Sequence, residues 1–173
     1  MKRITLIVCC LMLSLASFAQ KYDTGFKQTH RLKISGKTTI MKGQLTYDGK
    51  EQLSMIYSDP EGDYFIIDGS QIKMNLLGKK ATLDADKVPM TKLQRATLLN
   101  CLNGNWEQAA KDNNAKSTVT EKLGFRTVDI ASDKVVPRGG YKSLSITYRI
   151  KDGNVTRLVL EDAVGIEDTY EMQ

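Results

Sequence analysis

Residues that commonly carry out catalysis or bind metals are scarce in this sequence of 173 residues. It contains one histidine, His30, and three cysteines, of which Cys9 and Cys10 lie within the first twenty residues. The remaining cysteine, Cys101, has no partner for a disulfide within the chain and cannot build a cysteine-based metal cluster. We expect its thiol to be buried as a small apolar group, and we expect no metal and no cofactor.

The patterns of known catalytic sites are missing as well. No Gly-x-Ser-x-Gly motif occurs, which argues against a hydrolase nucleophile elbow. Ser35-Gly36-Lys37-Thr38 looks like the end of a phosphate-binding loop, but Arg31 stands where the first glycine belongs and β-branched residues follow instead of a helix. Asp59, Glu61 and Asp63 do not have the spacing of an EF-hand calcium loop. The sequence therefore favours a protein that is not an enzyme.

Long apolar runs are absent except at the start of the chain. Met1-Lys2-Arg3 precedes an apolar run from Ile4 to Ala16, and Ser17-Phe18-Ala19 offers small residues at the positions that a signal peptidase reads. The run is too short to span a bilayer comfortably. We expect residues 1–19 to be a cleaved signal peptide and residues 20–173 to form one exported domain, with an uncleaved signal anchor as the alternative.

An excess of one charge is also missing. Lys2 and Arg3 leave with the signal peptide, so 23 of the 25 basic residues remain against 20 acidic ones, and the net charge falls to +3. The basic residues are scattered and no aromatic residues alternate with them, which argues against nucleic-acid binding.

What the sequence does contain is a two-residue alternation of apolar and polar positions. It is clear from Thr38 to Leu76, returns from Leu144 to Leu160, and continues in a more polar run from Ile166 to Tyr170. Such alternation is typical of antiparallel sheets with one face in water. The segment from Tyr22 to Ile34 is ambiguous, part helix and part first strand.

Turn residues separate these predicted strands. Asp48-Gly49, Asp68-Gly69 and Asp152-Gly153 are dipeptides that favour tight hairpins. Asp59-Pro60-Glu61-Gly62 has the composition of a type I turn with proline in its second position.

A helical segment from Asp86 to Asn114 interrupts the strands. Asp86 suits the amino-terminal cap, Pro89 suits the first turn, and Gly104 suits the carboxyl-terminal end. A second short helix is expected to begin at Trp106.

The first of these helices is predicted to be amphipathic. Its apolar residues fall on one stripe of a helical wheel: Met90, Leu93, Thr97, Leu98, Cys101 and Leu102. Lys92 and Arg95 fall on the far side, with Leu99 beside them as an apolar exception. This helix is expected to cover the apolar face of the sheet, either as a solid core or over a cavity for an apolar ligand; composition leaves both open.

Several short motifs, taken in order, resemble one protein family. They are Phe26-Lys27-Gln28, Gly43-Gln44-Leu45, Tyr57-Ser58-Asp59-Pro60 and Ile66-Ile67-Asp68-Gly69. In this order and spacing they resemble the periplasmic lipoprotein carrier family LolA. The helical segment with Pro89, Leu98-Leu99 and Trp106 is similar to the central helices of that family.

The resemblance implies a mainly β fold with some helix: a half-open antiparallel β-barrel covered by a helical lid over an apolar cavity. The implied function is a periplasmic carrier that accepts acylated lipoproteins from an inner-membrane ABC-type releasing complex and carries them to the outer membrane. The acceptor there is unknown, and we expect a monomer. The alternative is a cell-envelope module of the same fold that senses lipid or docks a protein partner.

The same resemblance implies which residues meet the ligand. The cavity is expected to be lined by Leu45, Tyr47, Leu53, Met55, Tyr57, Ile72, Met74, Leu144, Ile146 and Tyr148. The lid is expected to consist of the helical stripe Met90, Leu93, Thr97, Leu98, Cys101 and Leu102.

Two departures from the family pattern concern details. Where the family has an arginine that fastens the lid, this sequence has Gly49 beside Lys50, and lysine lacks the planar fork of arginine. The sequence also ends at Gln173, before the family's last strand, so we expect either a shortened variant or a fragment.

Overall fold

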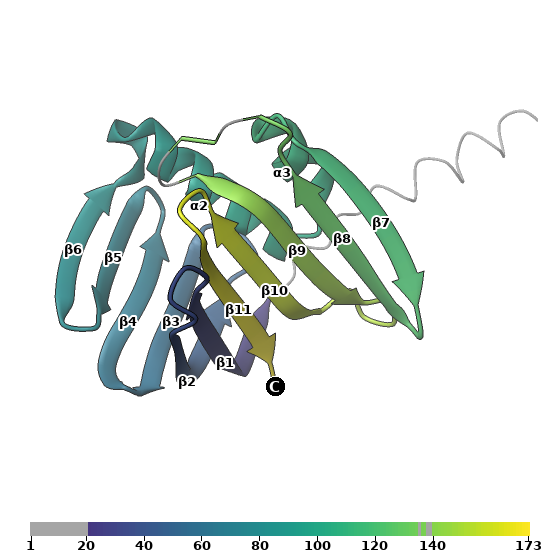
Figure 1. The fold of residues 1–173 in the computed structure, drawn as a ribbon. Coiled ribbons are helices and arrows are strands. Elements are labelled where there is room, and N and C mark those ends of the chain that lie inside the picture. Colours follow the sequence, from purple (N-terminus) through teal and green to yellow (C-terminus); the bar gives the residue numbers. More distant parts are fainter. Residues whose placement is uncertain (1–20, 135, 138–139) are drawn as a thin grey trace, which may run out of the picture.

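The computed structural model describes residues 21–134, 136–137 and 140–173. The predicted signal peptide lies outside these residues. A strongly curved sheet of antiparallel strands makes up most of the fold, and helices cross its concave side (Figure 1). In the first half of the sheet the strands are β1 (Tyr22–Leu32), β2 (Thr38–Tyr47), β3 (Gln52–Asp59), β4 (Glu61–Asp68), β5 (Gln71–Leu76) and β6 (Lys79–Asp84). In the second half they are β7 (Lys116–Lys122), β8 (Phe125–Ala131), β9 (Tyr141–Arg149), β10 (Val155–Asp162) and β11 (Ile166–Met172).

The strand order explains why the helices lie where they do. The 11 strands follow the order β6-β5-β4-β3-β2-β1-β11-β10-β9-β8-β7, so β6 and β7 form the two edges of the sheet. The chain between these edges contains the 3-10 turn η2 (Ala85–Lys87) and helices α2 (Pro89–Leu102) and α3 (Trp106–Asp112). Because this segment must connect opposite edges, it crosses the concave side of the sheet (Figure 1).

The core lies between these helices and the sheet. Leu102 and Cys101 of α2 and Ala109 of α3 are buried together with Val128 and Ile146 from the second half of the sheet. The alternation of the strands decides this burial, since residues two apart on a strand face the same side. The mainly β, half-open antiparallel fold with helices across its open side, as predicted from the sequence, is thus confirmed.

Local predictions had mixed outcomes. The segment that was ambiguous contains no helix: Tyr22–Leu32 forms β1, and Lys33 and Ile34 lie in the turn that follows. Gly104 follows the end of α2 in a left-handed conformation with φ of 73°. Asp86 does not cap α2: it belongs to η2, where its amide donates to Asp84, and Val88 precedes the helix without a side-chain cap. The pairing of Ser58 with Glu61 makes Pro60 the third residue of its turn, so the type I assignment was wrong.

The two edge strands β6 and β7, and β8 next to β7, were not predicted. Every residue of β7 is exposed, so its sequence lacks the buried apolar positions that mark a strand. In β6 most residues are also exposed, and in β8 only Val128 and Ile130 are buried. Strands that bury little carry a weak alternation signal.

Gly43 allows a close approach of β2 and β3, next to a shift in their register. A Cβ atom at this position would overlap the carbonyl oxygen of Ile56 and lie 2.9 Å from a ring carbon of Phe26. We expect Gly43→Ala to lower the free energy of unfolding by about 1–3 kcal/mol because backbone and ring must both move. Urea denaturation measures this.

Gly25 provides the matched control. It lies on the neighbouring strand β1, and a Cβ atom there would meet nothing closer than the Gln173 side chain at 3.5 Å. Gly25→Ala should change stability by less than about 0.5 kcal/mol. Equal stability of the two variants would contradict the close approach at Gly43.

Candidate functional site

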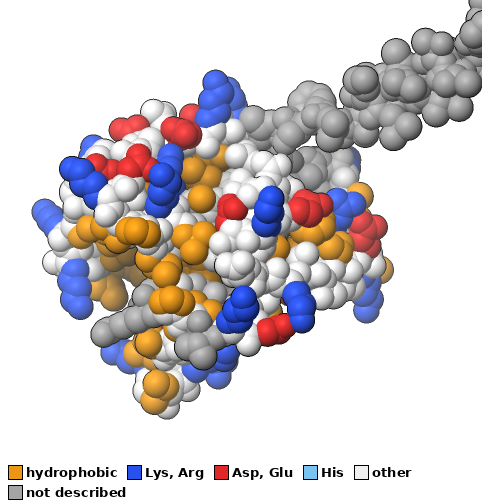
Figure 2. All heavy atoms as spheres, turned by 90° about the horizontal axis from the view of Figure 1, so that it is seen from above, with side chains coloured by type: hydrophobic (Ala, Val, Ile, Leu, Met, Phe, Trp, Pro, Cys, Tyr) orange, Lys and Arg blue, Asp and Glu red, His pale blue; other side chains and the backbone are white. Residues whose placement is uncertain are grey.

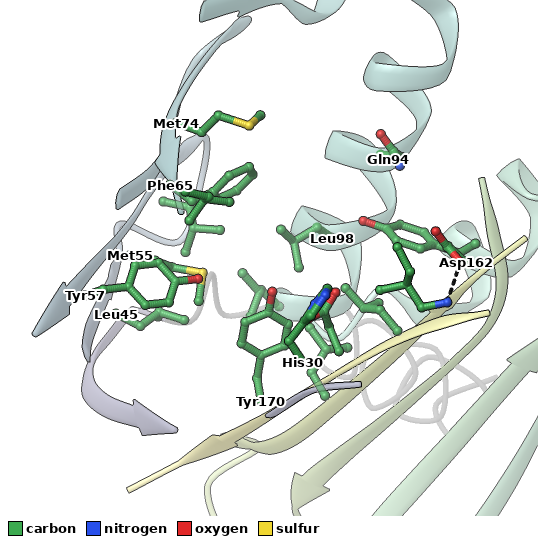
Figure 3. Close-up of a pocket in the computed structure, with 18 of the residues that line it drawn as sticks. His30, Leu45, Met55, Tyr57, Phe65, Met74, Gln94, Leu98, Asp162 and Tyr170 are labelled. Atoms are coloured by element: carbon green, nitrogen blue, oxygen red, sulfur yellow. Dashed lines mark hydrogen bonds and ion pairs between the residues drawn. The ribbon is translucent and has the colours of Figure 1, made fainter. Parts of the chain in front are cut away.

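A cavity of about 350 Å³ lies between helix α2 and the concave side of the sheet (Figure 3). Its size is near the lower end of the range of about 300–1,000 Å³ that is usual for small-molecule sites. Residues from β1 to β5, α2 and β9 to β11 line it: His30, Leu45, Leu53, Met55, Tyr57, Phe65, Met74, Leu76, Gln94, Leu98, Leu102, Tyr141, Leu158, Leu160, Asp162, Ile166, Asp168, Tyr170 and Met172.

One side of the cavity is apolar. Met55, Phe65 and Met74 come from three adjacent strands and point toward Leu98 of α2 (Figure 3). Methionine side chains adapt their shape to a ligand, and apolar walls of this kind hold hydrocarbon without any directional contact. This side of the cavity is suited to an alkyl chain.

The other side carries a hydrogen-bonded polar group. The Tyr57 hydroxyl donates to Gln28 Oε1 at 2.6 Å, and Gln28 Nε2 donates to Asp168 Oδ1 at 2.8 Å. His30 Nδ1 lies 2.8 Å from the same oxygen. A carboxylate oxygen can only accept, so the proton of this bond is on His30 Nδ1. Two side chains thereby hold Asp168 at the cavity, and Tyr57 holds one of them, Gln28.

Two further tyrosines line the cavity beside this group. Burial raises the pKa of Tyr141 and of Tyr170 above the ordinary value, and the negative charge of Asp168 is the second cause. Burial likewise raises the pKa of Tyr57, again with Asp168 as the next cause. All three phenols therefore stay protonated at physiological pH and can donate hydrogen bonds.

Helix α2 is fastened to the sheet at its carboxyl-terminal end. The Tyr22 hydroxyl donates to the Leu102 carbonyl at 3.1 Å, and the Tyr148 hydroxyl donates to the Cys101 carbonyl at 2.8 Å. The last carbonyls of a helix lack the amide that would follow four residues on, and the tyrosine hydroxyls bond to two of them. The Cys101 carbonyl also accepts from the Gly104 amide at 3.1 Å.

A third tyrosine joins the same helix end to the turn after β2. Asn103 Nδ2 donates to the Tyr47 hydroxyl at 2.7 Å, and that hydroxyl donates to the Lys50 carbonyl at 3.0 Å. Arg95 of α2 lies 3.5 Å from Glu51 in this turn. Within the described residues the Lys50 ammonium makes no hydrogen bond or ion pair, and the contacts of this turn with the end of α2 come from the Tyr47 hydroxyl and from Glu51.

A smaller hollow of about 210 Å³ adjoins the cavity. The two share Phe65, Met74, Leu98 and Tyr141 among their lining residues. Arg95 lines the smaller one, and its side chain is only 14% exposed. The prediction that Arg95 faces away from the apolar side of α2 was therefore wrong.

The structure brings part of the predicted site together. Five of the ten candidate residues from the strands line the cavity: Leu45, Leu53, Met55, Tyr57 and Met74. Of the predicted lid stripe, Leu98 and Leu102 line it. That any of them binds a ligand stays a prediction.

The other five strand residues lie outside the cavity. Ile72 lines the smaller hollow, and Tyr47 faces the end of α2. Leu144, Ile146 and Tyr148 belong to β9 and are buried in the core that packs under the helices. They share the same alternation as the cavity residues, but the helices fill the space in front of β9.

The remaining lid residues also lie outside the cavity. Thr97 and Cys101 are buried on the side of α2 that faces α3 and β9, where Asn113 Nδ2 donates to the Thr97 hydroxyl at 2.7 Å. Met90 and Leu93 are half-buried and do not line it. Leu99, the apolar exception, is 8% exposed. It is buried because α2 lies in a concave sheet, which surrounds more of the helix than a flat one would.

Several cavity residues were not predicted from the sequence. Ile166, Asp168, Tyr170 and Met172 alternate along β11 and share one face. The two-residue alternation puts Asp168 on the same face of β11 as Ile166 and Tyr170. An aspartate is normally assigned to the solvent-exposed face, so it was not predicted to line the cavity. His30 lies on β1, where the choice between helix and strand was open.

Other features of the described part of the chain give no second candidate. It holds no group of three or more His, Cys, Asp or Glu side chains placed to bind a metal ion, and Asp63 instead accepts a hydrogen bond from the Leu77 amide at 2.7 Å. None of its helices has the length and apolar character to cross a bilayer. A more open groove of about 640 Å³ is lined by exposed polar residues such as Lys21, Asp23 and Gln52.

Comparison with known proteins finds no matching protein-family model and no matching curated protein. Among solved structures, a LolA superfamily protein from Nitrosomonas europaea is 9% identical, with a TM-score of 0.40 over 90% of this chain and 85% of that one. Lipoprotein LppX from Mycobacterium tuberculosis is 10% identical, with a TM-score of 0.33 over 98% and 94%. The family that the sequence motifs resemble is thus among the proteins to which this chain is similar.

A chain of the MucA/MucB complex from Pseudomonas aeruginosa is also similar. It is 10% identical, with a TM-score of 0.46 over 92% of this chain. The chain described here spans about half of its length, 53%.

The contact between Tyr47 and Asn103 should protect the Cys101 thiol from chemical labelling. Cys101 is fully buried, and burial raises the pKa of its thiol to about 12. At about pH 8 only about one thiol in ten thousand would be ionised, so a water-soluble maleimide should react very slowly. We expect Tyr47→Phe to raise the labelling rate about fivefold to tenfold, because losing this contact loosens the last turn of α2.

Tyr64→Phe is the control for this experiment. Tyr64 is a half-buried residue of β4 whose hydroxyl makes no hydrogen bond to any described residue. Its variant should label at the rate of the parent, with peptide mass spectrometry locating the label at Cys101. Unchanged labelling in Tyr47→Phe would show that Tyr47 does not hold the helix end.

Proposed function

We propose that this protein is a carrier in the periplasm that binds the acyl chains of lipoproteins in the cavity under α2 and shuttles lipoproteins from the inner to the outer membrane. The observation that carries the proposal is the apolar wall formed by Met55, Phe65, Met74 and Leu98 beneath a helix that covers the open side of the sheet. The motifs that resemble the LolA family support the same function.

The energetics of acyl chains favour an enclosed site. Each CH₂ group that leaves water gains about 0.8 kcal/mol, so an exposed acyl chain costs on the order of 10 kcal/mol. Transfer between membranes does not require a bond to be made or broken. A cavity with an adaptable apolar wall is therefore sufficient for this function.

The size of the cavity has a consequence for how it would load. At about 350 Å³ it suits one small ligand, and a cargo with several acyl chains requires α2 to move. The tyrosine contacts hold the carboxyl-terminal end of the helix. Opening would therefore begin at its amino-terminal end, near Met90, and the adjoining hollow would then join the cavity.

The same proposal includes the route of the protein and its partners. Residues 1–19 would direct export, residues 20–173 would form the carrier domain, and an inner-membrane ABC-type complex would supply the lipoprotein. Seen from above, apolar side chains gather over part of the molecule among basic and acidic ones (Figure 2). Such a surface suits transient contact with membrane partners.

A docking module is the second candidate, and strand β7 is the observation that favours it. All seven of its residues are exposed, and as an edge strand it has unpaired backbone groups along one side. Edge strands of this kind can add a strand from a partner protein. In that case the cavity would be dispensable and β7 would not.

Met55 tests the carrier directly. It is 5% exposed and lines the cavity, so Met55→Glu would place a carboxylate against bound hydrocarbon. We expect binding of acylated cargo to fall by about 100-fold or more. Native mass spectrometry of protein from a periplasmic extract and release of lipoprotein from spheroplasts both measure the loss. Met74→Glu, at a half-buried position of the same wall, provides a second variant.

Ile56→Glu is the matched control because Ile56 neighbours Met55 on the opposite face of β3 and is 49% exposed. It should bind and release cargo like the parent, with circular dichroism confirming that all variants are folded. A folded Met55→Glu protein that still carries lipoprotein would refute the carrier function and favour docking through β7.

A further inference from the structure

We infer that the cavity selects the head group of its ligand: it takes acyl compounds with an uncharged, hydrogen-bonding head and discriminates against those with a free carboxylate or phosphate. This inference rests on the proposed binding of acyl chains and goes beyond it by naming the chemistry at the end of the chain. It is carried by the polar side of the cavity.

The first observation is that this side presents negative charge. Asp162 and Asp168 both line the cavity, and none of the described residues that line it is a lysine or an arginine. Lys33, close by in the chain to His30, lies 2.8 Å from Glu161 and 3.1 Å from Glu167 and is thus occupied by two carboxylates.

These charges act against an anionic ligand. In a partly enclosed apolar cavity the effective dielectric constant is lower than in water, so like charges repel more strongly there. The head group of a fatty acid or a phosphatidic acid that lies beside Asp162 and Asp168 would have no lysine or arginine among the described residues that line the cavity. The nearest arginine on α2, Arg95, lines the adjoining hollow instead. Such a ligand would have to leave its head in water or take up a proton.

The second observation is that hydrogen-bonding groups at this side are left for a ligand. Tyr141 and Tyr170 are half-buried and line the cavity, and their hydroxyls make no hydrogen bond to any described residue. Asp168 uses its Oδ1 atom for Gln28 and His30, and no described residue bonds to its Oδ2 atom. Donors and acceptors are therefore both available.

The pattern of donors and acceptors fits a neutral head. Burial raises the pKa of both tyrosines, so each can donate a hydrogen bond to an ester, amide or hydroxyl oxygen. The carboxylate of Asp168 can accept from a hydroxyl or an amide N–H. A monoacylglycerol or an N-acylated peptide has groups of both kinds next to its acyl chain, whereas a fatty-acid carboxylate has acceptors alone.

Two ligands with the same chain separate head-group selection from burial of hydrocarbon. Monododecanoylglycerol and dodecanoate carry the same acyl chain and differ in the charge of the head. At about pH 7.5, where dodecanoate is ionised, we expect the parent protein to bind the monoacylglycerol about tenfold or more tightly. Titration calorimetry below the aggregation concentration of both compounds measures the two affinities.

Variants that remove the charge and keep the shape test the cause. In Asp168→Asn the amide oxygen can still accept from Gln28 and His30, and in Asp162→Asn it can still accept from the amides of Val164 and Ile166. In each variant the affinities for the two ligands should differ by about threefold or less, mainly because dodecanoate binds more tightly. Asp129→Asn, which removes an exposed carboxylate of β8, should leave the difference unchanged.

The possible results distinguish this inference from the function on which it rests. Equal or tighter binding of dodecanoate by the parent would overturn the head-group selection while leaving the carrier function in place. A difference that persists in both cavity variants would also overturn it. Binding of neither compound would overturn the proposed function and the inference together.

Discussion

An antiparallel sheet that curves without closing leaves its concave face open to water, and the whole structure depends on how that face is covered. Here the segment between the edge strands β6 and β7 provides the cover, because it has to cross from one edge to the other. The apolar residues that the strands point inward are shielded from water only once α2 and α3 lie over them. The core, the cavity and the position of the lid all follow from this connection.

The concave face is filled unevenly. Over β8 and β9 the helices pack directly on the sheet, and Val128 and Ile146 are fully buried. Over β3 to β5 the side chains of Met55, Phe65 and Met74 do not reach α2 closely enough to fill the space, and a cavity remains. A solid core and a cavity are therefore not alternatives in this fold: the core lies over β8 and β9, and the cavity lies where residues of β1 to β5 and of β9 to β11 face α2 across an unfilled space.

The sequence predicted most of the strands that bury an apolar face and missed the exposed strands β6 and β7, together with β8, which buries only Val128 and Ile130. Strands β2, β3, β5 and β9 to β11 follow period two, whereas β4 is a short apolar run between turn residues. Gly104 and Trp106 mark the boundary between the helices. The two-residue alternation assigns a residue to the concave face of the sheet, but it does not show whether a helix packs against that residue. Ile146 and Met55 were therefore both predicted to line the cavity. Asp168 was not predicted as a cavity residue because its partners, Gln28 and His30, lie about 140 positions away in the chain. They contact it only through the pairing of β1 with β11.

The tyrosine contacts to α2 have a consequence for how the sequence can vary. Tyr22 and Tyr148 donate to backbone carbonyls of the helix, which every amino acid at positions 101 and 102 would offer. The attachment of the lid is therefore largely independent of the side chains that the helix presents to the cavity. Substitutions at Gln94 or Leu98 could alter the shape and polarity of the ligand site while the helix stays in place. A fold with this property can diversify its ligands over evolution without first losing its closed form.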